Sequence, residues 1–410
     1  MIRINKYFPF AFIYFFVNSV ALPFGLTYTA LLAPFFYIWI LLTRKKELLL
    51  PFIAILSPFV LIQVLFVGVE VHTYFVSLIN LLLVYIFCQA AYTFFKVCAD
   101  PERIFRRILI INFILCLVAI AIYFTPYYKI LWIEQNLTQG VINFKRMKLF
   151  TYEASYYATL FTPIFFFFFL QYLLRQNTIR SGWLLLMIFL PYVLSFSLGV
   201  ISCIIIAGFI TWLFHFSELT KKRRVLNTIV SAGATVGGVM TFVVLFFRHN
   251  PLFTRIGNIL SGNDLSGKGR TLDAFMLAER MLTEKDKYWG IGLGQVKILG
   301  EDIIRNYYQY PPDYPVAIPN AMAETLAIFG WTGFILKLSV EVFLFFYTKV
   351  WNNYYRLMLF FFIFIYQFTG SFLTNIAEYV IWILAFTNVF RQFDVQRKKQ
   401  EVFYLAGSGL

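Results

Sequence analysis

The first segment whose residues could carry out chemistry lies in the middle of the chain, over residues 144–158, with the sequence FKRMKLFTYEASYYA. The guanidinium of Arg146 can bind a phosphate through two parallel hydrogen bonds, or it can orient the carboxylate of Glu153 for proton transfer. Lys145 adds a second cation, and the hydroxyl of Tyr156 could donate to a sugar. The alternative is structural, because helix N-termini stabilise carboxylates and tyrosines often anchor the ends of membrane spans.

A second group of basic residues lies in residues 248–320, a long polar stretch between apolar runs. Arg270 ends a Gly- and Ser-rich turn and directly precedes residues 271–282, whose apolar spacing predicts an amphipathic helix lying on the membrane. A guanidinium and the backbone N–H groups of a helix start would converge there, which makes the position suitable for a phosphate. A flexible solvated turn is the alternative interpretation of this stretch.

Two glycine-containing segments follow. Residues 288–294, YWGIGLG, predict a tight turn, and they do not form a dinucleotide-binding fingerprint because no βαβ pattern surrounds them. At the start of the next apolar run, Asn320 and Glu324 are four residues apart and would share one helical face. Gly330 and Gly333 in the same run would allow another helix to pack closely.

Ionisable residues also lie within the last apolar runs. Lys337 and Glu341 repeat the four-residue spacing, which predicts that they neutralise each other inside the membrane or line a passage. Three further polar side chains lie near the outer ends of the last two runs, and they are expected to close the cavity that Lys337 and Glu341 would line. They are Gln367, Asn375 and Glu378.

The elements that must position these residues are membrane helices. The chain has 410 residues, of which 60% are hydrophobic and 13% charged, whereas soluble domains have about 25% charged residues. This composition excludes a cytosolic enzyme, and the long apolar runs exclude an outer-membrane barrel. The sequence predicts an all-α, polytopic integral membrane protein with about twelve transmembrane helices. Their expected ranges are 8–23, 26–43, 48–69, 73–95, 108–125, 151–174, 182–196, 199–216, 225–247, 321–348, 357–374 and 376–390.

Basic residues mark every second connection between these spans, from residues 44–46 to the C-terminal segment after residue 390. Because short basic loops stay in the cytoplasm, this alternation places both termini there. The N-terminal run is interpreted as a retained first span. The predicted layout is a transmembrane bundle over 1–247 with an outer segment at 126–150, a large, partly helical outer loop over 248–320, spans over 321–390, and a cytoplasmic tail over 391–410 whose residues 406–410 are expected to be a vector-derived addition.

The formal charge of +15 is explained by this topology and does not indicate nucleic acid. Three of the four cysteines lie inside apolar runs and only three histidines are present, so neither a disulfide framework nor a Cys- or His-based metal site is predicted. No Asp-x-Asp pair stands on an outer segment to hold Mg²⁺. We therefore expect no metal and no cofactor.

Three motifs, taken together, resemble the bacterial O-antigen polymerase and ligase superfamily, particularly its Wzy-type polymerases. Arg146 followed by Glu153-Ala-Ser-Tyr-Tyr-Ala158 is similar to the family's arginine and Glu-Pro-Ser-like segment at a mid-chain span. Gly269-Arg270, an amphipathic stretch and Gly290-Ile-Gly-Leu-Gly294 are similar to the pattern of its large loop.

The third motif is Asn320 with Gly330-Trp-Thr-Gly333, which is similar to the family segment that opens the following span. The resemblance covers about residues 140–335, and all three motifs occur in the family's order. One departure is Pro319, which stands where ligases and some polymerases have a histidine.

The resemblance implies a C-type membrane glycosyltransferase-like fold in the bacterial inner membrane, with the active site facing the periplasm. The implied activity is metal-independent polymerisation of undecaprenyl-pyrophosphate-linked oligosaccharide repeat units for O-antigen or a related surface polysaccharide. The implied partners are these lipid-linked glycans, membrane lipids and a chain-length regulator protein. Catalytic roles are expected for Glu153, Arg146 and Arg270, and substrate contacts for Arg255, Arg280, Asn320, Glu324, Tyr156 and Lys145.

Glu153 is the first candidate for the base, followed by Glu324 and His249. Two other functions stay open. An O-antigen ligase would transfer the finished glycan to the lipid A core, and Pro319 argues against it. A lipid-linked oligosaccharide flippase would suit twelve spans, but such transporters typically contain two similar halves, and no repeat relates residues 1–205 to 206–400.

Overall fold

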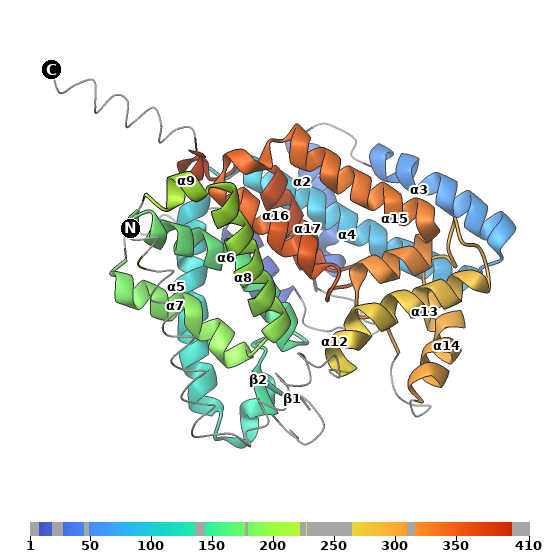
Figure 1. Ribbon diagram of the computed structural model, residues 1–410, viewed down its shortest axis with the longest axis horizontal. Helices are drawn as coiled ribbons and strands as arrows, with labels where there is room; N and C mark the ends of the chain where they lie inside the picture. The colour runs from blue at the N-terminus through green and yellow to red at the C-terminus, as the bar shows by residue number, and fades with distance from the viewer. Residues whose placement is uncertain are drawn as a thin grey trace. The chain divides into compact units, whose positions relative to one another are not determined.

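The computed structural model describes residues 8–18, 28–44, 49–135, 144–176, 179–221, 227, 265–309 and 316–395. The described chain is mostly helical and contains one two-stranded sheet (Figure 1). Five helices are long and apolar enough to cross a membrane, over Leu50–Val67, Val71–Val97, Pro101–Ile122, Ala154–Leu173 and Ala321–Tyr347. Six shorter apolar helices are Phe8–Val17, Leu31–Leu42, Ser181–Ser195, Leu198–Phe214, Tyr354–Tyr366 and Ile376–Phe386.

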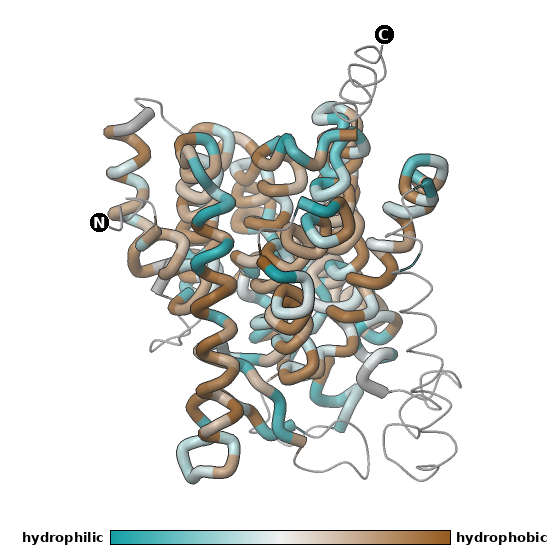
Figure 2. Tube along the Cα trace, turned by 90° about the vertical axis from the view of Figure 1, so that its left-hand side faces the viewer, coloured by the Kyte–Doolittle hydropathy of each residue, from teal (hydrophilic) through white to brown (hydrophobic). Residues whose placement is uncertain are grey.

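These helices confirm an all-α protein of the membrane type. Their surfaces expose large apolar side chains, such as Phe66 with 80% and Leu42 with 76% of its area accessible, which suits contact with lipid rather than water. Brown, the hydrophobic colour, covers large parts of the helices in Figure 2. Each helix overlaps one of the predicted spans, while the predicted span at 225–247 lies outside the described residues except for residue 227.

The chain divides into two compact units. Unit 1 contains residues 1–99, 267–349 and 363–383. Its elements are α1 (Phe8–Phe12), η1 (Ile13–Val17), α2 (Tyr28–Arg44), α3 (Leu50–Ile62), η3 (Gln63–Val67), α4 (Val71–Val97), α12 (Leu265–Arg270, from residue 267), α13 (Leu272–Thr283), η5 (Gln295–Lys297), α14 (Leu299–Tyr308), α15 (Ala321–Tyr347) and most of α17 (Ile376–Phe386).

Unit 2 contains residues 100–266, 350–362 and 384–410. Its elements are α5 (Pro101–Ile122), η4 (Pro126–Ile130), β1 (Trp132–Gln135), β2 (Phe144–Met147), α6 (Ala154–Leu173), α7 (Ser181–Ser195), α8 (Leu198–Phe214), α9 (Phe216–Leu219), η6 (Val350–Asn352), most of α16 (Tyr354–Tyr366) and η7 (Arg391–Phe393).

Side-chain caps explain where several of these helices begin. The Glu70 carboxylate accepts hydrogen bonds from the backbone of Thr73 and His72 at the start of α4. Hydrogen bonding to Thr73, more than that to His72, lowers the pKa of Glu70. Asp100 accepts from Arg103 N at the start of α5, where Pro101 occupies the first turn. Both patterns satisfy backbone N–H groups that a helix start leaves without partners.

The core of unit 1 forms around α13 and the first half of α15. Ala274, Leu277, Ala278 and Met281 are buried on one face of α13 in a cluster that includes residues of α15. The predicted helix therefore exists, but its apolar face packs against protein and not on the membrane surface. Only its opposite side, including Leu272, is exposed.

The core of unit 2 forms around α6, which is buried over most of its length. Its aromatic run at residues 165–168 packs against other rings of the unit, including Phe390 and Tyr192. Helix α7 packs along α5 and α6. The β1–β2 hairpin, which the sequence did not predict, is fixed to α5 because Trp132 Nε1 donates to Ala119 O at 2.8 Å.

Candidate functional site

Arg146 lies on β2 of unit 2, opposite Ile133 of β1. It is buried, with 9% of its area accessible. Its Nε donates to Ser195 O at 2.9 Å and its Nη1 donates to Gln135 Oε1 at 2.6 Å. Ser195 is the last residue of α7, so the guanidinium binds a helix C-terminus, where a positive charge is favourable. Arg146 therefore joins the hairpin to α7, a role that its sequence context did not predict.

Glu153 is the N-cap residue of α6, one position before the helix, with an extended backbone at φ −144° and ψ 147°. Its side chain makes no hydrogen bond that caps the helix, although the residue occupies the N-terminal position that the structural alternative expects. The half-buried carboxylate instead lies beside the positive end of the α6 dipole. Its backbone carbonyl accepts from Tyr157 N and Thr151 Oγ1, which fixes the position of Glu153.

The neighbouring predicted ligands are held by aromatic rings. The Lys145 ammonium lies 3.7 Å from the ring centroid of Tyr128 and 4.9 Å from that of Tyr123. Tyr128 donates its hydroxyl proton to Glu134, and this hydrogen bond raises the pKa of Tyr128. These contacts place one cation, one carboxylate and two rings at the base of the hairpin.

The Tyr156 ring packs against Tyr152 with centroids 4.8 Å apart. Tyr156 is buried, with 5% of its area accessible, while Tyr152 is exposed.

In unit 1, Arg270 is the last residue of α12, and Thr271 separates it from the first residue of α13. Its backbone carbonyl accepts a hydrogen bond from Asn320 Nδ2 at 2.8 Å. The structure thus brings together two predicted site residues that are fifty positions apart. The Arg270 side chain is half-buried.

Asn320 is the N-cap residue of α15 and is fully buried. Its Oδ1 accepts from Met322 N and Ala323 N, and its Nδ2 donates to Phe368 O as well as to Arg270 O. These four bonds use the full hydrogen-bonding capacity of a side-chain amide. The arrangement favours a positioning role for Asn320 over the predicted direct contact with substrate.

Arg280 lies on the exposed side of α13, with its guanidinium carbon 5.3 Å from the ring centroid of Tyr307 on α14. The next tyrosine, Tyr308, donates to the buried carboxylate of Asp273 near the start of α13. These contacts join α13 to α14. Two other candidates, Arg255 and His249, lie outside the described residues.

The glycine-rich turn predicted at residues 288–294 is inserted into a break in α15. Gly330 has φ 65° and ψ −168°, which interrupts the helix. The absence of a side chain at Gly330 lets the backbone of Tyr288 approach closely, so the predicted close packing is made by this turn rather than by another helix. Ile291 N and Gly292 N donate to the carbonyls of Ala327 and Ile328 before the break.

After the break, Trp331 N and Thr332 N donate to the carbonyls of Lys287 and Tyr288. The turn thus provides partners for backbone groups on both sides of the interruption. A buried glutamine of η3 completes the junction, because Gln63 Nε2 donates to Trp289 O and Ile328 O. The position of Gln63 was not predicted, although a lone amide within an apolar run is a recognisable signal.

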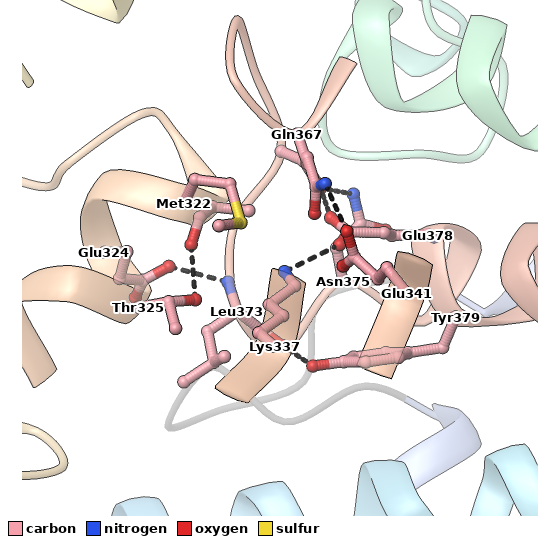
Figure 3. Close-up of polar contacts among 12 residues, drawn as sticks. Met322, Glu324, Thr325, Lys337, Glu341, Gln367, Leu373, Asn375, Glu378 and Tyr379 are labelled. Carbon is pink, nitrogen blue, oxygen red and sulfur yellow. Dashed lines mark hydrogen bonds and ion pairs between the residues drawn. The ribbon is translucent and has the colours of Figure 1, made fainter. Parts of the chain in front are cut away.

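Polar side chains of α15, α17 and the loop between α16 and α17 gather in one cluster (Figure 3). Lys337 pairs with Glu378 of α17 at 3.2 Å, so the predicted Lys337–Glu341 pair is wrong. Glu341 instead accepts from Gln367 Nε2 at 2.7 Å. Spacing along one helix could not reveal these partners, because both come from distant segments of the chain.

The same cluster includes Glu324, whose Oε2 accepts from Leu373 N at 2.6 Å. Ser371 Oγ donates to Glu378 Oε2, and Asn375 Nδ2 donates to Ser371 Oγ. These contacts bring Gln367, Asn375 and Glu378 together with the charged residues of α15, while the predicted cavity stays a prediction.

No protein-family model matches the chain, and no curated protein matches it significantly.

Proposed function

We propose that the chain polymerises lipid-linked oligosaccharide repeat units at the periplasmic face of the bacterial inner membrane. The donor is a glycan on undecaprenyl pyrophosphate, and the acceptor is a sugar hydroxyl of an incoming lipid-linked repeat unit. The hydroxyl oxygen attacks the anomeric carbon, the bond from that carbon to the pyrophosphate oxygen breaks, and the hydroxyl proton passes to a carboxylate. Undecaprenyl pyrophosphate leaves with the bonding electrons.

The proposal includes about twelve spans with both termini in the cytoplasm, so that residues 126–150 and 248–320 face the periplasm. The five long and six shorter apolar helices support the span count, which the predicted ninth span would complete. The alternation of basic connections along the sequence supports the orientation.

The position of Arg270 carries the proposal. Asn320 holds the Arg270 backbone through a buried side chain, so the guanidinium projects from a fixed point at the junction of α12, α13 and α15. Negative charge develops on the pyrophosphate as it leaves, and a preorganised guanidinium stabilises that charge in the transition state. Arg280 on the adjacent α13 is a second candidate ligand for the same anion.

Glu153 is the candidate base. Its carboxylate is not used to cap α6, and its backbone is fixed by two hydrogen bonds to the carbonyl. Arg146 supports this segment by tying β2 to α7. In this scheme Glu153 accepts the proton of the attacking hydroxyl, or positions that hydroxyl.

One observation favours a transporter as the second candidate. Helix α15 is interrupted at Gly330, and discontinuous helices with nearby charged residues are typical of substrate sites in transporters. In this chain, however, backbone groups on both sides of the break bind the chain's own glycine-rich turn. The break is thus filled by protein, which makes glycosyl transfer the better-supported function.

The decisive experiment uses the purified full-length protein in lipid nanodiscs with a synthetic polyprenyl-pyrophosphate repeat unit. We expect a ladder of lengthened glycans together with released polyprenyl pyrophosphate. A ligase would require added lipid A core as acceptor. A flippase would move the lipid across vesicles without lengthening it, and either of these results would contradict the proposal.

Replacing Glu153 by glutamine is expected to slow transfer by about 10²–10⁴-fold, the usual contribution of a positioned acid or base. Glutamine keeps the length and shape of the side chain, so the amount of folded protein should change little, which size-exclusion chromatography checks. Initial rates of ladder formation measure the effect. The matched control is Glu134→Gln in the same unit, which alters an exposed carboxylate of the hairpin. Equal rates for both variants would remove Glu153 from the reaction.

A further inference from the structure

Two buried carboxylates lie close together in the helical part of unit 1, one on each of two helices. Glu341 of α15 has 5% of its area accessible, and Glu378 of α17 has 1%. A charge inside a membrane segment is costly unless a counter-charge or a proton neutralises it. The two carboxylates differ in how this requirement is met.

The partners of Glu378 suit an ionised carboxylate. Lys337 places its ammonium 3.2 Å from Glu378 Oε1, and Ser371 Oγ donates to Glu378 Oε2 at 2.6 Å. Both oxygens therefore have donors, and the negative charge has a cation. Lys337 is the lysine of this cluster, and its ion pair is made with Glu378 (Figure 3).

Glu341 accepts one hydrogen bond from a described residue, and the donor is a neutral side chain. Gln367 Nε2 donates to Glu341 Oε2 at 2.7 Å. The Gln367 side chain is fully buried, and its Oε1 has no hydrogen-bond partner among the described residues. A buried acceptor without a donor is unfavourable, and it points to a missing hydrogen atom close to Glu341.

We propose that Glu341 binds a proton and forms a ring of two hydrogen bonds with Gln367. The Glu341 hydroxyl donates to Gln367 Oε1, while Gln367 Nε2 donates to the other Glu341 oxygen. One proton then gives the orphaned Gln367 oxygen its donor and removes the uncompensated charge. The site is a proton-binding site within the spanning helices, separate from the ion pair of Lys337 and Glu378.

The other polar groups around Glu341 agree with a protonated Glu341 beside an ionised Glu378. On α15, the remaining carboxylate is Glu324, which accepts from the backbone of Leu373. On α17, Tyr379 donates its hydroxyl to Leu373 O. Lys337 and Glu378 are the other titratable groups that act on Glu341. Within the described residues, none of the hydrogen bonds of these groups gives Glu341 a second donor, so the proposed proton provides the missing hydrogen bond.

The test compares Glu341→Gln with Glu378→Gln in the full-length protein. A glutamine at position 341 supplies N–H in place of O–H, so the ring with Gln367 is kept and the Tm should equal or exceed that of the wild type. A glutamine at position 378 leaves the Lys337 ammonium without its counter-charge, so the Tm should fall by several degrees. An equal fall for both variants, or failure of Glu341→Gln to fold, would overturn the proposal.

Infrared spectroscopy of the same proteins at neutral pH provides a readout that a purely structural role would not move. The carbonyl stretch of a protonated carboxylic acid, shifted in D₂O, should occur in the wild type and in Glu378→Gln. It should be lost in Glu341→Gln. A band that persists in Glu341→Gln would place the proton on another group and would also overturn the proposal.

Discussion

Replacing Arg270 by alanine is expected to abolish detectable glycan lengthening, with a loss on the order of 10²–10³-fold or more in rate. The physical reason is that, in the proposed reaction, the leaving pyrophosphate would lose the guanidinium that stabilises its negative charge. The fold should be preserved, because Asn320 binds the backbone carbonyl of residue 270, which alanine retains. Ladder formation by the purified protein measures the activity, and Tm measures the fold.

The control for this variant is Arg305→Ala. Arg305 also lies in unit 1, on α14, and forms an ion pair with Glu301 one turn away on that helix. Its loss should leave the rate within about a factor of two, because an i,i+4 ion pair contributes little. Arg270→Lys should recover part of the activity, since lysine keeps the positive charge but cannot form the bidentate hydrogen bonds of a guanidinium. A normal ladder from Arg270→Ala would remove Arg270 from the pyrophosphate site.

Arg146 is a less direct test of the same chemistry. Its guanidinium is buried and donates to Ser195 O and Gln135 Oε1, so truncation would break the contact between the hairpin and α7. Removing a charged donor from buried partners costs about 1–3 kcal/mol of stability. Loss of activity in Arg146→Ala would therefore combine a folding defect with any catalytic one.

The sequence was informative where local patterns decide the structure. Long apolar runs predicted the helices. Helix α15 begins directly after Asn320, so Glu324 lies in its first turn, while Asn320 is the extended N-cap residue and does not share a helical face with it. Glycines at 290, 292 and 294 predicted a tight turn, and all three have positive φ.

Contacts between distant segments could not be predicted in the same way. Lys337 pairs with Glu378 across 41 residues although Glu341 is its helical neighbour, because the approach of α17 decides the partner. The hairpin of β1 and β2 also escaped prediction, since two strands of four residues carry too little alternation to be recognised. The break in α15 depends on a turn that lies forty residues earlier in the chain.

Replacing Gly330 or Gly290 by alanine is expected to destabilise the protein by several kcal/mol. Gly330 occupies a backbone region that is essentially restricted to glycine, and Gly290 has φ 78°. A Cβ on Gly290 would overlap the Ile328 carbonyl, and a Cβ on Gly330 would overlap the Tyr288 carbonyl. Backbone atoms cannot move aside as a flexible side chain can, so the turn would separate from the helix.

Separating the turn from α15 would destabilise the protein by more than the backbone strain at the substituted glycine. The hydrogen bonds that the turn makes to α15 would be lost together, and backbone groups around the break would be left without partners, each at about 1–3 kcal/mol when buried. The matched controls are Gly182→Ala and Gly199→Ala in α7 and α8, where an added Cβ meets no atom within 4 Å. Alanine there should be neutral or stabilising by up to about 1 kcal/mol.

Thermal unfolding of the detergent-solubilised variants, followed by size-exclusion chromatography, distinguishes the two pairs. We expect Gly290→Ala and Gly330→Ala to lose monodisperse protein well below the wild-type Tm, while the two controls unfold at or slightly above it. If all four variants unfolded at the wild-type temperature, the turn would not lie against α15 in the folded protein. The break in α15 would then not be filled by protein, and transport would become as well supported as glycosyl transfer.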